Sequence, residues 1–136
     1  MKTLHKAFPL DKLIVVDAHG KLDLEGSKRM LRELAADPQF DSMTEVLLDL
    51  RDIQCEMSTL DIYKLAAFMG GPDPALPTRR KIAVLVGGIA EFDHAAFLQM
   101  CIANSGVRLA AFVDYEAADA WLTADLPPDP KEGVDP

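Results

Sequence analysis

The stretch formed by residues 45–69 constrains the fold of this chain more than any other. It opens with Val46-Leu47-Leu48-Asp49-Leu50, which is apolar at both alternating sets of positions except at Asp49. Such a run is typical of a strand that is covered on both faces, as in parallel sheets. A polar turn follows, and Ser58 with Asp61 three residues later has the pattern of a helix capping box. The stretch therefore predicts a buried strand, a turn and a helix.

The segments on either side repeat this order. Apolar, partly β-branched runs predict further strands at residues 13–16, 82–86 and 107–113, and residues 4–8 have a weaker strand pattern. Apolar residues spaced by three and four predict the helices, which begin after Asp23, after Ser58, near residue 91 and after Asp114. The first helix is predicted to end at Asp37-Pro38 and the second at Gly70-Gly71-Pro72. The third is predicted to end at about residue 104, with Gly106 as its left-handed cap.

This order reads as an N-terminal β-hairpin followed by alternating helices and strands. Parallel strands joined by right-handed helical connections are the simplest way to pack it. We therefore predict an α/β fold with one mostly parallel sheet of about four or five strands and about four helices. The domain is predicted to span residues 1–125. Residues 126–136 are proline-rich and polar, and they predict a flexible tail.

Charge and cysteine usage exclude several classes of function. The net charge of −8 argues against a nucleic-acid partner, because phosphate backbones are met by Lys and Arg. No apolar run approaches the ~20 residues of a transmembrane helix, and no signal peptide is recognisable. Cys55 and Cys101 form no Cys-x-x-Cys pair, which favours reduced thiols and a cytoplasmic location. The basic clusters formed by Lys28-Arg29 with Arg32 and by Arg79-Arg80-Lys81 are interpreted as solvated faces.

The sequence predicts no catalytic site, metal site or cofactor. His5, His19 and His94 lack partners at metal-ligand spacing, and Gly87-Gly88 matches neither a dinucleotide-binding nor a P-loop motif. We expect a protein that is not an enzyme. The alternative is an enzyme in which His94, beside Glu91 and Asp93 at the carboxyl end of a strand, acts as an acid or base.

From residue 4 to residue 124 the chain resembles the STAS superfamily, and within it the bacterial SpoIIAA-like proteins. The resemblance is carried by the order of the elements and by four short motifs: Gly20-Lys21-Leu22, Leu48-Asp49-Leu50, Arg80-Lys81-Ile82-Ala83-Val84 and Ala117-Ala118-Asp119-Ala120-Trp121-Leu122. It implies a SpoIIAA-like fold and a non-enzymatic regulatory or binding module that engages a protein partner.

The resemblance also implies a regulatory site. Anti-anti-sigma members carry an Asp-Ser-Ser-Gly-Leu motif after the corresponding strand, and phosphorylation of its second serine switches partner binding. Here Ser58 and Thr59 supply the two hydroxyls, whereas the Asp and Gly of the motif are absent. Ser58 and Thr59 are therefore the candidate phosphorylation sites. The simpler interpretation is that Ser58 only caps the helix.

A second function follows from the similarity of SpoIIAA-like proteins to the CRAL-TRIO lipid-binding fold. It is the carriage or sensing of a small apolar ligand, with contact to a membrane surface as an option. The candidate pocket residues are Leu65, Phe68, Met69, Phe92, Phe97 and Met100. Ordinary core packing is the alternative for each of them. Homodimerisation through the edge of the N-terminal hairpin is a further option.

Overall fold

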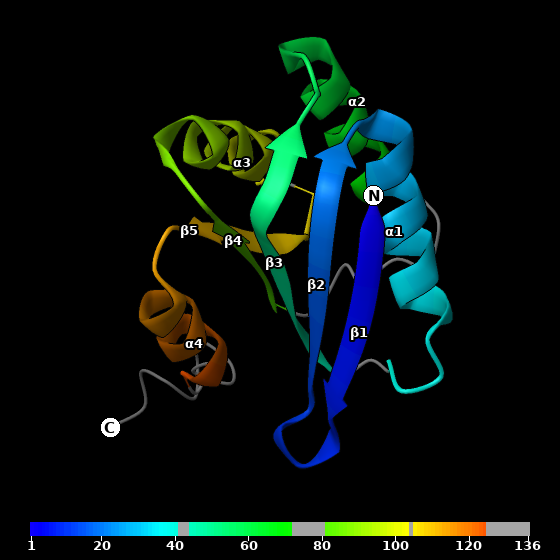
Figure 1. The fold of residues 1–136 in the computed structure, drawn as a ribbon, viewed down its shortest axis with the longest axis vertical. Helices are drawn as coiled ribbons and strands as arrows, with labels where there is room; N and C mark the ends of the chain where they lie inside the picture. Colours follow the sequence, from blue (N-terminus) through cyan, green and yellow to red (C-terminus); the bar gives the residue numbers. More distant parts are fainter. Residues whose placement is uncertain (41–43, 72–80, 104, 125–136) are drawn as a thin grey trace.

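The computed structural model describes residues 1–40, 44–71, 81–103 and 105–124, which form one α/β unit (Figure 1). The strands are β1 (Lys2–Phe8), β2 (Leu13–Leu22), β3 (Glu45–Cys55), β4 (Lys81–Val86) and β5 (Arg108–Phe112). The helices are α1 (Leu24–Ala36), α2 (Thr59–Met69), α3 (Ile89–Cys101) and α4 (Tyr115–Thr123), and a 3₁₀ turn, Pro9–Asp11, joins β1 to β2.

The five strands form one sheet in the order β1-β2-β3-β4-β5. β1 pairs antiparallel with β2, and every later pair is parallel. The predicted mostly parallel sheet with an N-terminal hairpin is thereby confirmed. The predicted tail at residues 126–136, Asn104 and the prolines at 72, 74 and 77 lie outside the described residues.

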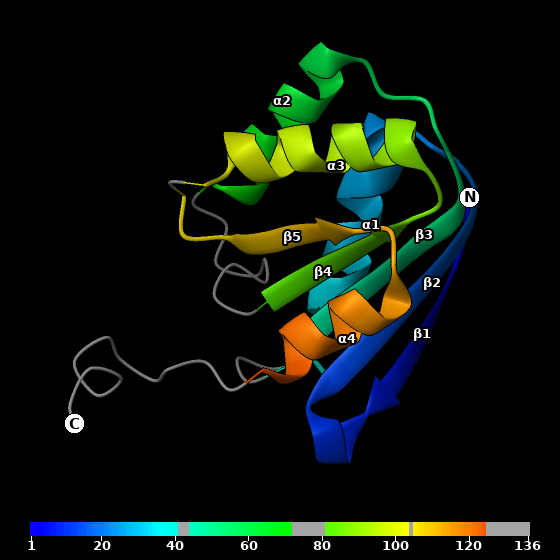
Figure 2. The same cartoon turned by 90° about the vertical axis from the view of Figure 1, so that its left-hand side faces the viewer.

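The helices divide unequally between the two faces of the sheet (Figures 1 and 2). The larger core lies between the sheet and α1, α2 and α3, and it includes Val16, Leu48, Leu34 and Leu65. On the other face α4 packs through Ala118 and Leu122 over a smaller core. α2 packs on α1 and α3, and Figure 2 shows it above α3. The larger core is therefore enclosed by the sheet on one side and by α1, α2 and α3 on the other.

The predicted caps position the helices. Asp23 accepts a hydrogen bond from the Gly26 amide at 2.7 Å. At the start of α2 the Ser58 hydroxyl accepts from the Asp61 amide, and the Asp61 carboxylate accepts from the Ser58 amide, both at 3.1 Å. These side chains satisfy N–H groups that have no partner within the helix.

α3 begins at Ile89, two residues earlier than predicted, with Gly88 as its N-cap. The turn before it passes close to β3. A Cβ added to Gly87 would lie 2.8 Å from the Arg51 carbonyl oxygen. The glycine is required here by the close approach of two backbones. α3 ends at Cys101 with Ile102 as its C-cap, three residues before the predicted end, so the prediction that Gly106 caps this helix is wrong, although Gly106 does have a positive φ of +89°.

β3 is longer than the predicted apolar run. It continues beyond Leu50 through Arg51, Asp52 and Gln54, which are exposed. These polar residues extend the ladder with β2, which also runs on to Leu22 after a register shift between Asp17 and His19. The second half, in which Ile53 and Cys55 are partly buried, stays a strand because its backbone still pairs with β2, although no helix covers its outer face.

Lys81 corrects the interpretation of Arg79-Arg80-Lys81 as a solvated face. Its side chain is buried, with 2% of its surface exposed. The ammonium donates to the Trp121 carbonyl at 2.6 Å and to the Ala124 carbonyl at 3.0 Å. It therefore holds the end of α4 against β4. Arg79 and Arg80 lie outside the described residues.

Candidate functional site

An apolar cavity lies between the sheet and the helices α1, α2 and α3. Its volume is about 80 Å³, counted as the space that the centres of water-sized spheres can occupy. About 10–15 Å³ of such space is enough for one water, so a small organic molecule is of the right scale. The described lining residues are Leu22, Ser27, Met30, Leu31, Leu48, Leu50, Ile53, Cys55, Met57, Ile62, Leu65, Met69, Val84, Glu91, His94, Ala95, Leu98 and Leu109.

The position of the cavity follows from the fold. The carboxyl-terminal halves of β2 and β3 supply Leu22, Leu50 and Cys55 to its wall, and the first half of α3 supplies Glu91 and His94. The carboxyl ends of parallel strands are where open α/β sheets bind ligands. A void in this place removes packing contacts that its wall would otherwise make. An occupant would restore those contacts.

Polar groups in the lining are few. Ser27 is buried and its hydroxyl donates to the Asp23 carbonyl at 2.8 Å, with the Met57 sulfur at 3.5 Å. His94 Nδ1 is buried and has no hydrogen-bond partner among the described residues. An unsatisfied buried polar atom costs free energy of the order of 1–3 kcal/mol. A ligand that forms a hydrogen bond with His94 Nδ1 would remove this cost.

Glu91 and His94 lie one helical turn apart and share the face of α3 that lines the cavity. Glu91 is half-buried and makes no hydrogen bond or ion pair with the described residues. Its carboxylate folds back towards the helix start, since a Cβ added to Gly88 would lie 2.7 Å from Glu91 Oε1. The positive end of the helix dipole favours this arrangement.

The predicted pocket residues are only partly brought together. Leu65 and Met69 line the cavity. Phe68 instead lies beneath two cations, with the Lys28 Nζ 5.6 Å and the Arg32 Cζ 5.1 Å from its ring centre. Phe92 packs on the core outside the lining, and Phe97 is half-buried outside it. Met100 is 67% exposed.

Sequence reasoning missed the contributions of α1 and the sheet. Met30 and Leu31 of α1, Leu48 of β3 and Val84 of β4 all line the cavity. Leu31, Leu48 and Val84 belong to apolar patterns that predict packed helices and strands, whereas Met30 lies outside the predicted spacing of α1. The amphipathic pattern of α1 predicts that one face of this helix is buried, but it does not show which face of the sheet the helix covers.

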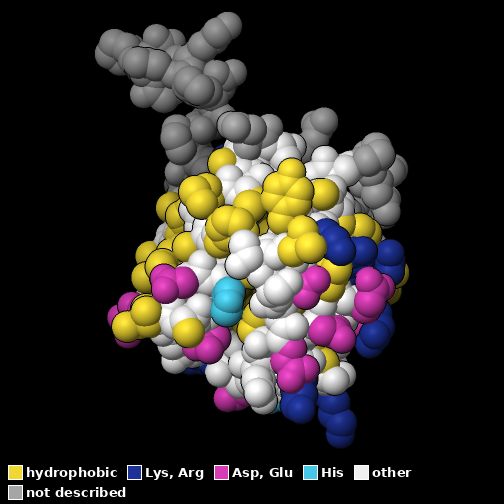
Figure 3. Space-filling view, turned by 90° about the horizontal axis from the view of Figure 1, so that it is seen from above, with side chains coloured by type: hydrophobic (Ala, Val, Ile, Leu, Met, Phe, Trp, Pro, Cys, Tyr) yellow, Lys and Arg dark blue, Asp and Glu magenta, His cyan; other side chains and the backbone are white. Residues whose placement is uncertain are grey.

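The candidate phosphorylation sites lie on the surface. Ser58 and Thr59 are exposed at the start of α2, and the Ser58 hydroxyl is engaged in the capping box. Large apolar side chains near them on α2 are also exposed, with Leu60 at 60% and Tyr63 at 62%. Figure 3, which views the molecule from above, shows apolar side chains gathered next to acidic and basic ones.

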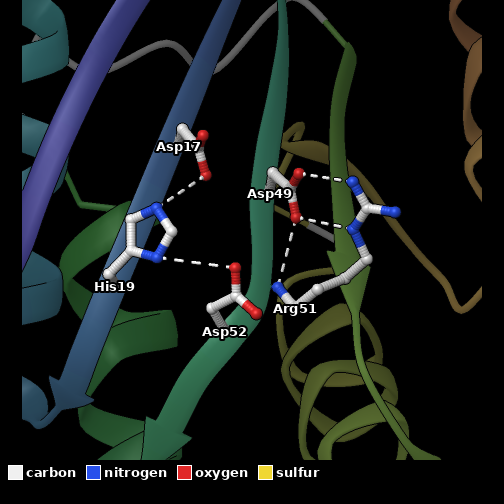
Figure 4. Close-up of polar contacts among 5 residues, drawn as sticks. All are labelled: Asp17, His19, Asp49, Arg51 and Asp52. Atoms are coloured by element: carbon white, nitrogen blue, oxygen red, sulfur yellow. Dashed lines mark hydrogen bonds and ion pairs between the residues drawn. The ribbon is translucent and has the colours of Figure 1, made fainter.

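A polar cluster lies on the opposite face of β2 and β3, beyond the part of that face that packs in the smaller core with α4 (Figure 4). Arg51 donates to Asp49 Oδ2 at 2.8 Å and to Asp49 Oδ1 at 3.0 Å. His19 lies 3.4 Å from a carboxylate oxygen of Asp17 and 3.4 Å from one of Asp52. The hydrogen bonds from Arg51 lower the pKa of Asp49 and raise that of Arg51 itself. Among the described residues, no group of three His, Cys, Asp or Glu side chains is suited to hold a metal ion.

The antiparallel first strand, the parallel remainder of the sheet and the helices on its two faces are those of a SpoIIAA-like fold. The crystal structure of an uncharacterised protein of Shewanella loihica PV-4, from the DUF3478 family and described as having a SpoIIAA-like fold, superposes with a TM-score of 0.54. The two sequences are 17% identical over 89% of this chain and 92% of that one, and this likeness confirms the predicted fold.

No protein-family model and no curated protein matches this sequence. Within the part of the chain that the structure describes, no helix is both long enough and apolar enough to cross a membrane.

Proposed function

We propose that this protein is a cytoplasmic, non-enzymatic STAS-like module that binds a small, mainly apolar ligand in the cavity between the sheet and α1, α2 and α3. The observation that carries the proposal is the cavity itself, with apolar walls and the unpartnered Nδ1 of His94 beside them. Ligand sites commonly combine an apolar wall with a few placed polar groups. The polar groups would set the orientation of the ligand, and the apolar wall would supply its affinity.

The proposal is tested by titrating the protein with 1-hexanol and following backbone amide NMR signals. We expect the largest shifts at residues that line the cavity, such as Leu65, Leu98 and Ala95. Native mass spectrometry of protein purified without detergent, followed by organic extraction, should also recover a small apolar molecule. A clean apo mass together with no localised NMR response to 1-hexanol would overturn the proposal.

A cavity-filling variant separates binding in the cavity from binding at the surface. Ala95 is buried on α3 and lines the cavity, so Ala95→Leu places three more carbon atoms in it. The matched control is Ala120→Leu, because Ala120 is exposed on α4 at the other face of the sheet. We expect Ala95→Leu to abolish the response to 1-hexanol and Ala120→Leu to retain it. Equal responses in both variants would place the binding elsewhere.

The second candidate function is regulation of a protein partner through the start of α2. It is supported by the exposed hydroxyl of Thr59 and by the exposed Leu60 and Tyr63 beside it. A phosphate here would meet the positive end of the helix dipole and would add about two negative charges to an apolar surface. This function and ligand binding use different surfaces, so one does not exclude the other.

This candidate is tested by comparing the proteins that wild type and Thr59→Glu retain from a bacterial extract. Lys64→Glu is the control, because it adds negative charge at another exposed position of α2. A partner that is lost or gained only with Thr59→Glu, and that also binds once purified, supports the switch. Identical binding by wild type and Thr59→Glu counts against it.

A further inference from the structure

We infer that the cavity selects ligands whose polar end donates hydrogen bonds, such as amines and alcohols, and discriminates against carboxylates. This inference rests on the proposed ligand binding and concerns the chemical class of the ligand. It is carried by the charge of the lining: Glu91 is the described lining residue with a fixed formal charge at neutral pH, and that charge is negative. An apolar acid of fatty-acid type would therefore bring a second carboxylate to an apolar site.

The electrostatics of the site strengthen this discrimination. Glu91 is half-buried and has no cation beside it among the described residues, so no fixed positive charge offsets it there. The interaction between two charges grows as the surrounding dielectric constant falls, and the lining of this cavity is mainly apolar. The helix dipole could attract a ligand carboxylate, but the Glu91 carboxylate already occupies that end of α3.

The hydrogen-bonding capacity of Glu91 and His94 favours the same class of ligand as the negative charge of Glu91. An ionised carboxylate only accepts hydrogen bonds, so Glu91 can be satisfied by an ammonium or a hydroxyl but not by another carboxylate. His94 lies one turn further along α3, and its imidazole can donate or accept through a nitrogen that has no partner among the described residues. A donor-bearing head group between these side chains satisfies both of them. The apolar part of the ligand then occupies the deeper wall formed by Leu48, Leu65 and Val84.

The test uses three probes that have the same six-carbon chain and different head groups: hexylamine, 1-hexanol and hexanoate. Their dissociation constants are measured at pH 7.5 by NMR titration of the full chain. For wild type we expect hexylamine and 1-hexanol to bind at least about tenfold more tightly than hexanoate. In Glu91→Gln, which keeps the size of the side chain and removes the charge, the amine and the acid should differ by less than about threefold.

Two further variants separate charge at the cavity from charge elsewhere. Asp93→Asn removes a charge from an exposed position two residues along α3 that does not line the cavity, and it should leave the order of the three probes unchanged. Gly88→Ala keeps every charge but displaces the Glu91 carboxylate, because the new Cβ would lie 2.7 Å from Oε1. We expect it to weaken hexylamine binding more than 1-hexanol binding.

The outcomes distinguish failure of the inference from failure of the proposed function. Hexanoate binding as tightly as hexylamine in wild type would overturn the inference and leave apolar ligand binding standing. An unchanged preference for hexylamine in Glu91→Gln would also overturn it. Absence of a localised response to all three probes would overturn both.

Discussion

The ammonium of Lys81 lies 5.4 Å from the centre of the Trp121 indole ring and donates a hydrogen bond to the carbonyl oxygen of the same residue at 2.6 Å. The two residues are 40 positions apart in the sequence. A cation near the carboxyl end of a helix is favoured by the helix dipole, and a ring face adds a cation–π attraction. This single side chain therefore joins β4 to the final turn of α4.

Replacing Lys81 with methionine should loosen α4. Methionine retains most of the apolar stem but leaves the Trp121 and Ala124 carbonyls without their donor. Hydrogen bonds to charged groups contribute about 1.5–3 kcal/mol each, and removal of the desolvated charge offsets part of that. We expect the free energy of unfolding to fall by about 2 kcal/mol in urea titrations. The control is Lys64→Met at an exposed position of α2, which should change it by less than about 0.5 kcal/mol.

Replacing Arg51 with glutamine should raise the pKa of Asp49 towards its ordinary value of 3.8. In wild type the lowered pKa means that the ion pair stabilises the fold above that value and ceases to do so as the pH falls through the folded pKa. Because the Arg51 side chain is 48% exposed, the expected effect at pH 7 is only about 0.2–1 kcal/mol.

The measurement for Arg51→Gln is an NMR titration of the Asp49 carboxyl carbon, with urea unfolding at pH 7 and pH 3. The stability difference between wild type and variant should narrow at the lower pH. A difference that widened as the pH fell would contradict the assignment of the lowered pKa to this pair.

Substitutions of Ser58 should show how much helix capping by this residue contributes to the free energy of unfolding. Ser58→Ala removes the hydroxyl that accepts from the Asp61 amide and should lower the free energy of unfolding by about 1 kcal/mol. Aspartate is also a good N-cap, so Ser58→Asp should lower it by much less. Urea unfolding followed by circular dichroism measures both. Equal losses in the two variants would show that the cap is not what Ser58 contributes.

The two cysteines provide a labelling test of the cavity. Cys55 lines the cavity, whereas Cys101 packs on the core from α3 outside the lining. With 1-hexanol at about ten times its dissociation constant, the empty form falls to about one tenth, so labelling of Cys55 by N-ethylmaleimide should slow about tenfold. Labelling of Cys101 should keep its rate. Mass spectrometry of the two peptides gives both rates in one sample, and equal protection would indicate a general effect of the alcohol.

Most of the fold was predictable because its signals are local. The capping pattern of Ser58 and Asp61 fixes the start of α2. The apolar run at residues 46–50 predicts a strand covered on both faces, but the cover on its outer face is incomplete: Leu47 packs in the core with α4, whereas Asp49 pairs with Arg51. The end of β3 was not predictable in this way, because Ile53 and Cys55 are interspersed with exposed polar residues, and pairing with β2 holds the segment as a strand.

The cavity and the burial of Lys81 were harder to predict because they depend on distant parts of the chain. Periodicity identifies the apolar stripe of a helix but not which member of the stripe reaches a void. Leu65 and Met69 reach it, whereas Phe68 on the same helix lies under Lys28 and Arg32. Lys81 is bonded to main-chain carbonyls, which carry no sequence signal.

The placement of α2 keeps its contribution to the cavity wall separate from the pairing of the strands. α2 rests on α1 and α3 and takes no part in the hydrogen-bonded ladders of the sheet. A change in the packing of α2 would therefore alter the cavity while every strand remains paired, and local rearrangements of this kind cost less free energy than global unfolding. Substitutions at the inner face of this helix, such as at Leu65 or Met69, would thus change the shape of the cavity and leave the strand pairing unaltered.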